Sequence, residues 1–483
     1  MSERRQLTYF VRTFGCQMNF HDSERIAGLL ESRGYRAAES PETADLVVFN
    51  TCAVREHAGD RLYGHLGHLA SLKRERPEFR IAVGGCQAQM DRERLLVKAS
   101  HVDVVFGTHN LASLPDLLER VELTGRPQAE ILEETEAFPS CLPSKRERSF
   151  RAWVTVSKGC DNTCTFCVVP ALRGPETSRR PEEVLAEIEG LVADGVVEVT
   201  LLGQNVNSYG HDLSGRVKFS DLLRSLGGAE GLRRVRFTSP HPKDFPEETI
   251  RAIAETPNVC EHVHLPLQSG SDEVLRAMRR SYRAQRYLRL VESLRNAVPD
   301  LALTTDLIVG FPGETERDFA DTLRVVEASR FDAAYTFIYS PRPGTPAASM
   351  NNQVAPGVIQ ERFARLVELV ERLGLEANRP LVGRIFEVLV EEVSIKNPDR
   401  LSGRTRSNKL VHFPKRDGIG AGGFVQVRID RATPHYLVGE AVERGRNPEG
   451  TASGEAVDRG RNPEGTASGE AGAAAVSAGE VSR

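Results

Sequence analysis

The sequence predicts an α/β protein of several domains: an N-terminal open parallel sheet, a central partial (β/α) barrel, a small all-β barrel and a repetitive tail. Three observations predict this order. Apolar strand-like runs alternate with helical patterns twice along the chain, short strands with glycine and asparagine turns follow, and a 15-residue unit then repeats. With 483 residues, of which 40% are apolar and 27% charged, the chain has the length and composition of about three globular domains.

The composition also excludes several classes of protein. No stretch reaches the roughly 18 consecutive apolar residues of a membrane span, and the N-terminus does not resemble a secretory signal. We therefore expect a cytoplasmic protein without a membrane partner. A net charge of −4 excludes a globally basic nucleic-acid coat but not a local basic patch. Eight cysteines are too sparse for a disulfide scaffold, which favours metal or redox chemistry.

Residues 5–125 are expected to form the open parallel sheet. Cys16, Cys52 and Cys86 each follow a strand-like run by two or three residues. Because the carboxyl ends of parallel strands share one edge of a sheet, we expect these three thiols to converge in space. The strand-like runs are Leu7–Phe14, Leu46–Phe49, Arg80–Val83 and Val102–Phe106.

The charged, proline-containing segment 126–150 predicts a connector, and we place the linker at 126–145 and the central domain at 146–378. Six strand-like runs with helical patterns between them predict a barrel or partial barrel with its active site at the carboxyl ends of the strands. These runs are Ala152–Val156, Val197–Leu202, Val235–Thr238, His262–Leu265, Leu303–Val309 and Ala333–Ile338.

Residues 379–442 change to short strands, which predicts a small all-β module. Its segment Arg400–Arg416 carries six Lys or Arg and no acid, and both a solvated strand face and a phosphate-binding face fit this pattern. The repeat tail, residues 443–483, has no aromatic residue and cannot bury a core, so we expect it to be disordered. The strand-like runs of the module are Ile385–Glu391, Lys409–Phe413 and Gly423–Ile429.

Cys160, Cys164 and Cys167 lie within eight residues, in the loop expected after the first central strand. Their spacing allows one short loop to surround a single metal centre. A zinc ion with a water in its fourth position and a cubane iron–sulfur cluster with one open iron both suit three thiolates, and the cysteines alone leave both open. Three packed cysteines without a metal do not fit, because a turn has no core for them to fill.

The strand ends of the central domain resolve this choice through a resemblance. The Cys160–Cys167 motif on such a barrel resembles that of the radical S-adenosylmethionine (SAM) enzymes, in which the open iron chelates the amino and carboxylate groups of SAM. Three later stretches match, in order, the strand ends where that superfamily holds the rest of the cofactor. The resemblance implies SAM contacts from Gly203, Gln204, Gln268, Ser269, Gly310 and Glu314.

Further segments narrow the resemblance to the methylthiotransferases of this superfamily. It covers about residues 7–442, including an N-terminal module, the central domain and a C-terminal RNA-binding TRAM domain at 379–442. The matching segments outside the TRAM domain are Gly15–Asn19, Asn50–Arg55, Gly84–Cys86, Arg173–Arg179, Arg236–Pro242 and Tyr339–Thr345.

The resemblance implies a mechanism with two [4Fe-4S] clusters. The catalytic Cys160, Cys164 and Cys167 would bind the cluster that cleaves SAM, and the resulting 5′-deoxyadenosyl radical would abstract the C2 hydrogen of an adenosine. A second cluster, on the three N-terminal cysteines Cys16, Cys52 and Cys86, would supply sulfur, and another SAM would donate the methyl group.

The resemblance also implies the partners. The residues of Gly15–Asn19 and Leu202–Tyr209 resemble those of family members that act on adenosine 37 of tRNA carrying an N6-isopentenyl group. Arg404, Arg406 and Lys409 would hold tRNA phosphates. We further expect a monomer, an electron donor such as flavodoxin or ferredoxin, and sulfur- or cluster-supply proteins.

Three alternatives stay open at this point. Two share the chemistry and differ in substrate: a methylthiotransferase acting on threonylcarbamoyl-adenosine of tRNA, or one modifying a ribosomal protein. The third is a non-catalytic RNA-binding protein that senses iron or redox state through its clusters. The SAM-contacting strand ends argue against the third alternative, because a sensor has no need for them.

Overall fold

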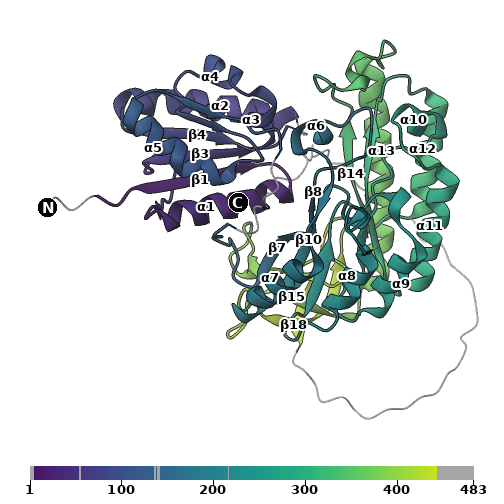
Figure 1. Ribbon diagram of the computed structural model, residues 1–483. Helices are drawn as coiled ribbons and strands as arrows, with labels where there is room; N and C mark the ends of the chain where they lie inside the picture. Colours follow the sequence, from purple (N-terminus) through teal and green to yellow (C-terminus); the bar gives the residue numbers. More distant parts are fainter. Residues whose placement is uncertain (1–4, 54–55, 135–137, 139–141, 216, 443–483) are drawn as a thin grey trace, which may run out of the picture. The chain divides into compact units, whose positions relative to one another are not determined.

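The computed structural model describes residues 5–53, 56–134, 138, 142–215 and 217–442, which form three regions of regular structure (Figure 1). The repeat tail, which we expect to be disordered, lies outside these residues. Among the described helices, none combines the length and the apolar character that a membrane span needs.

The N-terminal region has one six-stranded sheet whose neighbouring strands are all parallel, which confirms the predicted open sheet. One expectation is wrong, because β6 lies within the predicted connector 126–150. This edge strand has only three half-exposed residues and no apolar run, so its sequence gives no strand signal. In sheet order the strands are β2 (Arg36–Ala37), β1 (Thr8–Phe14), β3 (Leu46–Thr51), β4 (Arg80–Gly84), β5 (Val104–Phe106) and β6 (Gln128–Glu130).

Helices cover both faces of this sheet. Two of them, α1 and α5, bury apolar residues against one face, and the other three pack against the opposite face. The first helix begins at Gln17, directly after Cys16. The helices are α1 (Gln17–Ser32), α2 (Glu56–Glu75), α3 (Cys86–Asp91), α4 (Arg94–Lys98) and α5 (Leu114–Thr124).

The central region has six parallel strands in two sheets, ordered β11-β10-β7 and β12-β13-β14, which confirms the predicted partial barrel. A parallel bridge between Val235 and Val259 leads from the first sheet toward the second. A separate antiparallel pair consists of β8 (Ser157–Lys158) and β9 (Thr177–Ser178). The six parallel strands are β7 (Arg151–Thr155), β10 (Glu198–Leu202), β11 (Arg234–Phe237), β12 (His262–His264), β13 (Ala302–Val309) and β14 (Ala333–Ile338).

The two faces of these strands differ in chemistry. Val199, Leu201 and Val235 belong to the main apolar core, which the strands share with the surrounding helices. The alternating residues, such as Glu198 and Arg234, point to the other face. Charged side chains therefore line the inside of the partial barrel.

The helices of the central region are α6 (Val169–Arg173), α7 (Pro181–Ala193), α8 (Phe219–Leu226), α9 (Glu247–Glu255), α10 (Asp272–Ala277), α11 (Ala284–Ala297), α12 (Glu316–Ser329) and α13 (Pro356–Asn378).

The C-terminal region is a closed five-stranded barrel, ordered β15-β16-β17-β19-β18, which confirms the predicted all-β module. Two of its strands, β16 and β19, have no counterpart among the predicted runs, since a glycine interrupts each of them. A Cβ on Gly403 would lie 2.4 Å from the Leu389 carbonyl oxygen, so the barrel requires glycine there. The strands are β15 (Ile385–Val393), β16 (Arg400–Thr405), β17 (Leu410–Pro414), β18 (Phe424–Ala432) and β19 (Leu437–Val442).

Candidate functional site

The first cysteine centre, Cys160, Cys164 and Cys167, lies in the loop between β8 and α6. Gly159 turns the chain into this loop with φ +77°, and a Cβ there would lie 1.9 Å from the Pro175 carbonyl oxygen. The Cys160 amide donates to the Gly174 carbonyl over 3.1 Å, and the Cys167 amide donates to the Cys164 carbonyl over 3.2 Å. These bonds fold eight residues into a compact turn with three thiols close enough to interact electrostatically.

Each sulfur of this first centre faces one N–H donor. The Asn162 amide lies 3.3 Å from Cys160 Sγ, an Arg280 guanidinium nitrogen 3.5 Å from Cys164 Sγ, and the Val169 backbone nitrogen 3.4 Å from Cys167 Sγ. Burial raises the pKa of Cys160 and raises the pKa of Cys167 to about 12, so both thiols stay protonated without a bound cation. A metal centre deprotonates such thiols, and the donors then stabilise the sulfur charge.

The second cysteine centre, Cys16, Cys52 and Cys86, is assembled from three adjacent strands of the N-terminal sheet. Cys16 follows β1, Cys52 follows β3 and Cys86 opens the helix after β4. The predicted convergence at the sheet edge is therefore visible as neighbouring loops. Glycines allow the close approach: a Cβ on Gly15 would lie 2.9 Å from Cys52 Cβ, and one on Gly85, at φ +86°, would lie 2.8 Å from the Thr51 carbonyl oxygen.

Two buried asparagines hold the loops of the second centre together. The Asn19 amide donates to Asn50 Oδ1 over 3.2 Å, and the Asn50 amide donates back to the Asn19 carbonyl over 2.8 Å. A hydrogen bond with Cys52 lowers the pKa of Cys16 to about 6, and the Arg173 cation adds to this effect. Burial raises the pKa of Cys86. The shared hydrogen bond shows that the first two thiols lie side by side.

Gln204, just after β10, is the strand-end residue with the clearest free polar atoms. Its side-chain nitrogen and oxygen are both buried, and neither has a hydrogen-bond partner among the described residues. Ser157 Oγ lies close by in space, since a Cβ on Gly203 would lie 2.6 Å from it. This oxygen is also buried and has no hydrogen-bond partner among the described residues. Since buried polar groups are normally paired, these atoms suit a polar ligand that the protein binds.

The other predicted SAM contacts mostly serve the fold. Ser269 Oγ lies 3.2 Å from Thr322 Oγ1, and Glu314 accepts hydrogen bonds from the Gly310 amide over 2.8 Å and from Arg362 over 3.1 Å. Gln268 has φ +67°, and its backbone amide donates to the Asp306 carbonyl over 2.8 Å. The structure thus gives Ser269 and Glu314 supporting contacts, and their contact with SAM stays a prediction.

Comparison with known proteins assigns each region to a family. Residues 154–326 match the Radical SAM superfamily, residues 8–107 match the Uncharacterized protein family UPF0004, and residues 379–442 match the TRAM domain. A tRNA-2-methylthio-N(6)-dimethylallyladenosine synthase from Thermobifida fusca is 59% identical over 446 residues, which cover 91% of this chain and 90% of the relative. The chain belongs to the tRNA-2-methylthio-N(6)-dimethylallyladenosine synthase family.

Other relatives agree with membership in this synthase family. The synthase of that name from Streptomyces coelicolor is 58% identical over 439 residues, covering 90% of this chain and 87% of the relative. Among solved structures, the radical SAM methyltransferase TsrM from Kitasatospora setae matches with a TM-score of 0.53 and 18% identity, covering 71% of this chain and 75% of that chain. The TsrM likeness shows the fold alone.

The first centre fits the groups that this synthase family requires. Membership in the radical SAM superfamily implies a [4Fe-4S] cluster and SAM. Three thiols with one N–H donor each match the ligand set of a cubane that keeps one iron open, and the contact of Gln204 with SAM stays a prediction that its two unpaired buried atoms support. The zinc alternative is therefore excluded by the family and not by the cysteine spacing.

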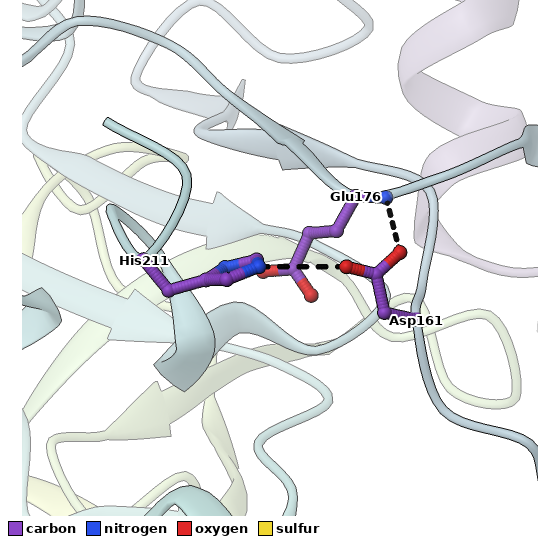
Figure 2. A group of neighbouring side chains, drawn as sticks. All are labelled: Asp161, Glu176 and His211. Carbon is purple, nitrogen blue, oxygen red and sulfur yellow. Dashed lines mark hydrogen bonds and ion pairs between the residues drawn. The ribbon is translucent and has the colours of Figure 1, made fainter. Parts of the chain in front are cut away.

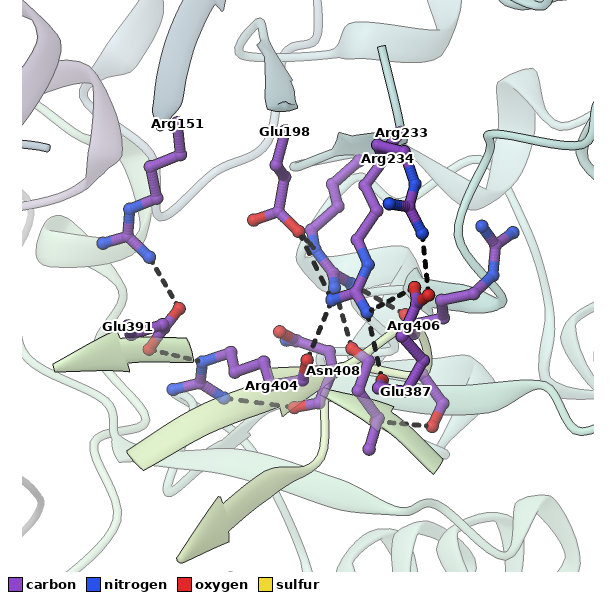
Figure 3. Close-up of polar contacts among 12 residues, drawn as sticks. Arg151, Glu198, Arg233, Arg234, Glu387, Glu391, Arg404, Arg406 and Asn408 are labelled. Atoms are coloured by element: carbon purple, nitrogen blue, oxygen red, sulfur yellow. Dashed lines mark hydrogen bonds and ion pairs between the residues drawn. The ribbon is translucent and has the colours of Figure 1, made fainter. Parts of the chain in front are cut away.

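The predicted RNA contacts Arg404, Arg406 and Lys409 belong to the TRAM barrel, and Figure 3 shows Arg404 and Arg406 where this barrel meets the central domain. Arg406 pairs with Glu261 over 2.7 Å, and Lys409 Nζ lies 2.6 Å from Asp332. Buried arginines of β11 return these contacts, since Arg234 and Arg236 donate to backbone carbonyls of 404–406. Arg406 and Lys409 therefore fasten the barrel to the central strands, whereas the Arg404 side chain contacts Glu391 and Asn408 within the barrel.

This position separates the basic residues from the first cysteine centre. Glu261 precedes β12 and Asp332 precedes β14, so the barrel contacts the amino ends of the central strands. Cys160 follows the carboxyl ends of β7 and β8. The prediction that Arg404, Arg406 and Lys409 hold phosphates is untested, and their carboxylate partners give them a structural role that the sequence does not reveal.

The sequence also gave no indication of a polar group beside the first centre, formed by Asp161, Glu176 and His211 (Figure 2). The Glu176 amide donates to Asp161 Oδ1 over 2.9 Å, and the two ring nitrogens of His211 each lie 3.4 Å from a carboxylate oxygen of Asp161 or Glu176. Burial raises the pKa of Glu176. These contacts tie the cysteine loop to the segments before β9 and after β10.

Proposed function

We propose that this protein adds a methylthio group to C2 of N6-isopentenyladenosine at position 37 of tRNA. The observation that carries this proposal is the name shared by relatives 58–59% identical over about 90% of the chain, combined with two separate groups of three cysteines. The aromatic C2–H bond has no acidic proton, so general acid–base chemistry cannot open it. The reaction needs one-electron chemistry at one site and a sulfur source at another.

The first centre provides the one-electron chemistry in this proposal. When bound, the [4Fe-4S] cluster and SAM supply the radical that removes the C2 hydrogen. Cys160, Cys164 and Cys167 hold this cluster, and the amide of Gln204 orients SAM by hydrogen bonds that are unmade in the protein alone. The three cysteines are partly buried, which limits the access of water and so protects a reactive species from side reactions.

The second centre provides the sulfur. We assign a second [4Fe-4S] cluster to Cys16, Cys52 and Cys86, because three converging thiols leave one iron of a cubane open, as at the first centre. The glycines beside Cys16 and Cys86 support this assignment, since a side chain at either position would fill the space between the loops. A further SAM supplies the methyl group.

The proposed reaction requires a tRNA substrate, an electron donor and a sulfur supply in addition to this protein. The substrate is tRNA already carrying N6-isopentenyladenosine, so an isopentenylation reaction must come first. A low-potential carrier such as flavodoxin or ferredoxin supplies electrons, and sulfur- or cluster-supply proteins restore the second centre. In this proposal the protein acts as a monomer in the cytoplasm.

Mass spectrometry of tRNA nucleosides from a deletion strain tests the proposed function. We expect the methylthiolated isopentenyladenosine to disappear, the unmethylthiolated nucleoside to accumulate, and the full chain on a plasmid to restore the product. Loss of a methylthiolated threonylcarbamoyl-adenosine, or of a modified ribosomal protein, with the isopentenyl product intact would reassign the substrate. If none of these changes and the reduced protein does not cleave SAM, the protein is not this enzyme.

A further inference from the structure

Arg173 is a buried cation that reaches from the central domain to the N-terminal domain. It is the last residue of α6, six residues after Cys167, and its side chain is 9% exposed. A terminal guanidinium nitrogen donates to Asp22 Oδ2 on α1 over 3.0 Å. Asp22 is 1% exposed and lies six residues after Cys16 on the helix that begins beside that cysteine.

The same guanidinium also belongs to the second cysteine centre. Its charge attracts Cys86 and Cys16 as well as Asp22, and Leu172, the residue before it, packs with Cys86 in one apolar cluster. An arginine carries five N–H donors in a fixed fork, so one side chain can serve a carboxylate and a sulfur together. Arg173 thus bridges Asp22 and Cys86 from a domain that contributes no cysteine to this centre.

The charges explain why a guanidinium is stable in this place. Burying an unpaired cation costs several kcal/mol, so a buried arginine requires anionic partners. Asp22 provides one negative charge, and the cysteine thiolates that hold a cluster provide the rest. The first centre has a parallel arrangement, in which Arg280 faces Cys164 Sγ at 3.5 Å. Arg280, however, comes from the same domain as its cysteines.

We propose that Arg173 is a positioning residue of the second centre, which it completes from the central domain by hydrogen-bonding the Cys86 sulfur and balancing the charge of the bound cluster. This inference rests on the second cluster in the proposed function. It implies that the N-terminal domain alone lacks part of its own cluster site. Arg173 therefore links the docking of the two domains to the electronic properties of the second cluster.

The interface offers a matched control for this proposal. Arg25, also on α1, pairs with Glu187 of the central domain over 2.8 Å, with side chains 9% and 14% exposed. It also donates to the Leu142 carbonyl over 2.9 Å. Arg25 has no described contact with a cysteine, so Arg25→Gln weakens domain docking without touching either centre.

The experiment uses the full chain with Cys160, Cys164 and Cys167 changed to Ala, so that only the second centre can hold iron. Arg173→Gln, Arg173→Lys and Arg25→Gln are each added to this background. Iron and sulfide per chain are measured after anaerobic reconstitution and desalting. The reduction potential of the remaining cluster is followed by electron paramagnetic resonance during a redox titration.

We expect Arg173→Gln to weaken cluster retention by about 10-fold or more, the usual cost of losing a side chain that supports metal ligands. The potential of the cluster that remains should shift to more negative values, because a lost cation disfavours the reduced, more negative state. Arg173→Lys keeps the charge and should restore much of the potential. Arg25→Gln should leave iron content and potential at the background values.

Unchanged iron content and potential in Arg173→Gln would overturn the proposal, and so would equal losses in Arg25→Gln. If Arg173→Gln does not fold, Arg173→Lys decides through its iron content, since an iron content identical to the background would show that the forked donors of the guanidinium do not support the centre. A background variant that binds no iron at all would instead contradict the second cluster of the proposed function, and with it this inference.

Discussion

The two cysteine centres differ in how the chain builds them. The first is one loop in which eight residues and a single glycine turn place three thiols together. The second takes one cysteine from each of three loops, 36 and 34 residues apart, and depends on the order β1-β3-β4 in the sheet. A local motif can thus be recognised from spacing, whereas a centre at a sheet edge becomes visible only through the topology.

The difference extends to the residues that support each centre. The first centre draws its N–H donors from its own domain, through Asn162, Val169 and Arg280. For the second centre we propose a donor from the neighbouring domain, Arg173, which pairs with Asp22 on the helix that follows Cys16. Changes to a single loop should therefore affect the first centre alone, and changes to the domain interface should affect the second.

The largest expected effects come from the glycines that allow each centre to close. Gly159→Ala places a Cβ 1.9 Å from the Pro175 carbonyl oxygen at φ +77°, and Gly85→Ala places one 2.8 Å from the Thr51 carbonyl oxygen at φ +86°. Backbone strain of this kind costs about 1–3 kcal/mol before the clash is counted. We expect the first variant to lose SAM cleavage and the second to lose only methylthiolation, as measured by product assays.

Gly125→Ala is the control for these two variants. This residue also has a positive φ, +64°, but nothing lies within 4 Å of the added Cβ. Iron content at both centres should stay at wild-type levels in this variant. If Gly85→Ala removed SAM cleavage as completely as Gly159→Ala, the two centres would not be separable.

A smaller effect is expected from Gln204→Ala, which acts only on the first centre. Because both polar atoms of this amide are buried and have no partner among the described residues, we expect their partners to come from the ligand. Losing such hydrogen bonds costs about 1–3 kcal/mol, which corresponds to roughly 10- to 100-fold weaker SAM binding. Calorimetry with SAM measures the dissociation constant.

Gln353→Ala, an exposed glutamine of the same domain, provides the comparison for this measurement. It should bind SAM as the wild type does. Equal SAM affinity in Gln204→Ala and the wild type would show that the free amide serves another purpose.

Replacing the basic residues of the barrel should change the stability of the protein more than it changes the activity of either cysteine centre. Changing Arg404, Arg406 and Lys409 to Ala removes the ion pairs with Glu261 and Asp332, which should lower the free energy of unfolding by about 2 kcal/mol. Melting temperature and tRNA binding at several salt concentrations are the measurements. If these residues hold phosphates instead, the salt dependence of binding flattens while the melting temperature stays constant.

Two exposed residues of the same basic segment, Lys415 and Arg416, form the matched set. Their change to Ala should leave the melting temperature unchanged. Equal melting temperatures in both sets would show that the ion pairs to the central domain contribute little.

The smallest effect is expected from removal of the repeat tail after Val442. The tail has no aromatic residue and no core-forming pattern, so its loss should leave both centres, the melting temperature and tRNA modification close to wild type. Calorimetry and nucleoside analysis measure these properties. A clear loss of modification in cells would show that the tail binds a partner of one of the centres.

The sequence predicts most of the fold and both groups of cysteines, but not the edge strand or the side chains that support the cysteines. Long apolar strands and the Cys160–Cys167 motif carry strong local signals, and the parallel sheet follows from them. The polar edge strand Gln128–Glu130 has no such signal, because its pairing depends on tertiary hydrogen bonds. Arg173 is invisible as a ligand-supporting residue for the same reason, since Asp22 lies 151 residues away in the chain.

One measurement tests the separation of the two centres most directly. Cys16, Cys52 and Cys86 are changed to Ala together, and iron, sulfide, 5′-deoxyadenosine and methylthiolated nucleoside are determined on the same preparation. We expect iron to fall by half, to roughly four atoms per chain for one remaining cubane. SAM cleavage should continue while no sulfur is attached to adenosine. Unchanged iron content, or full methylthiolation by this variant, would contradict the account of two centres with separate roles.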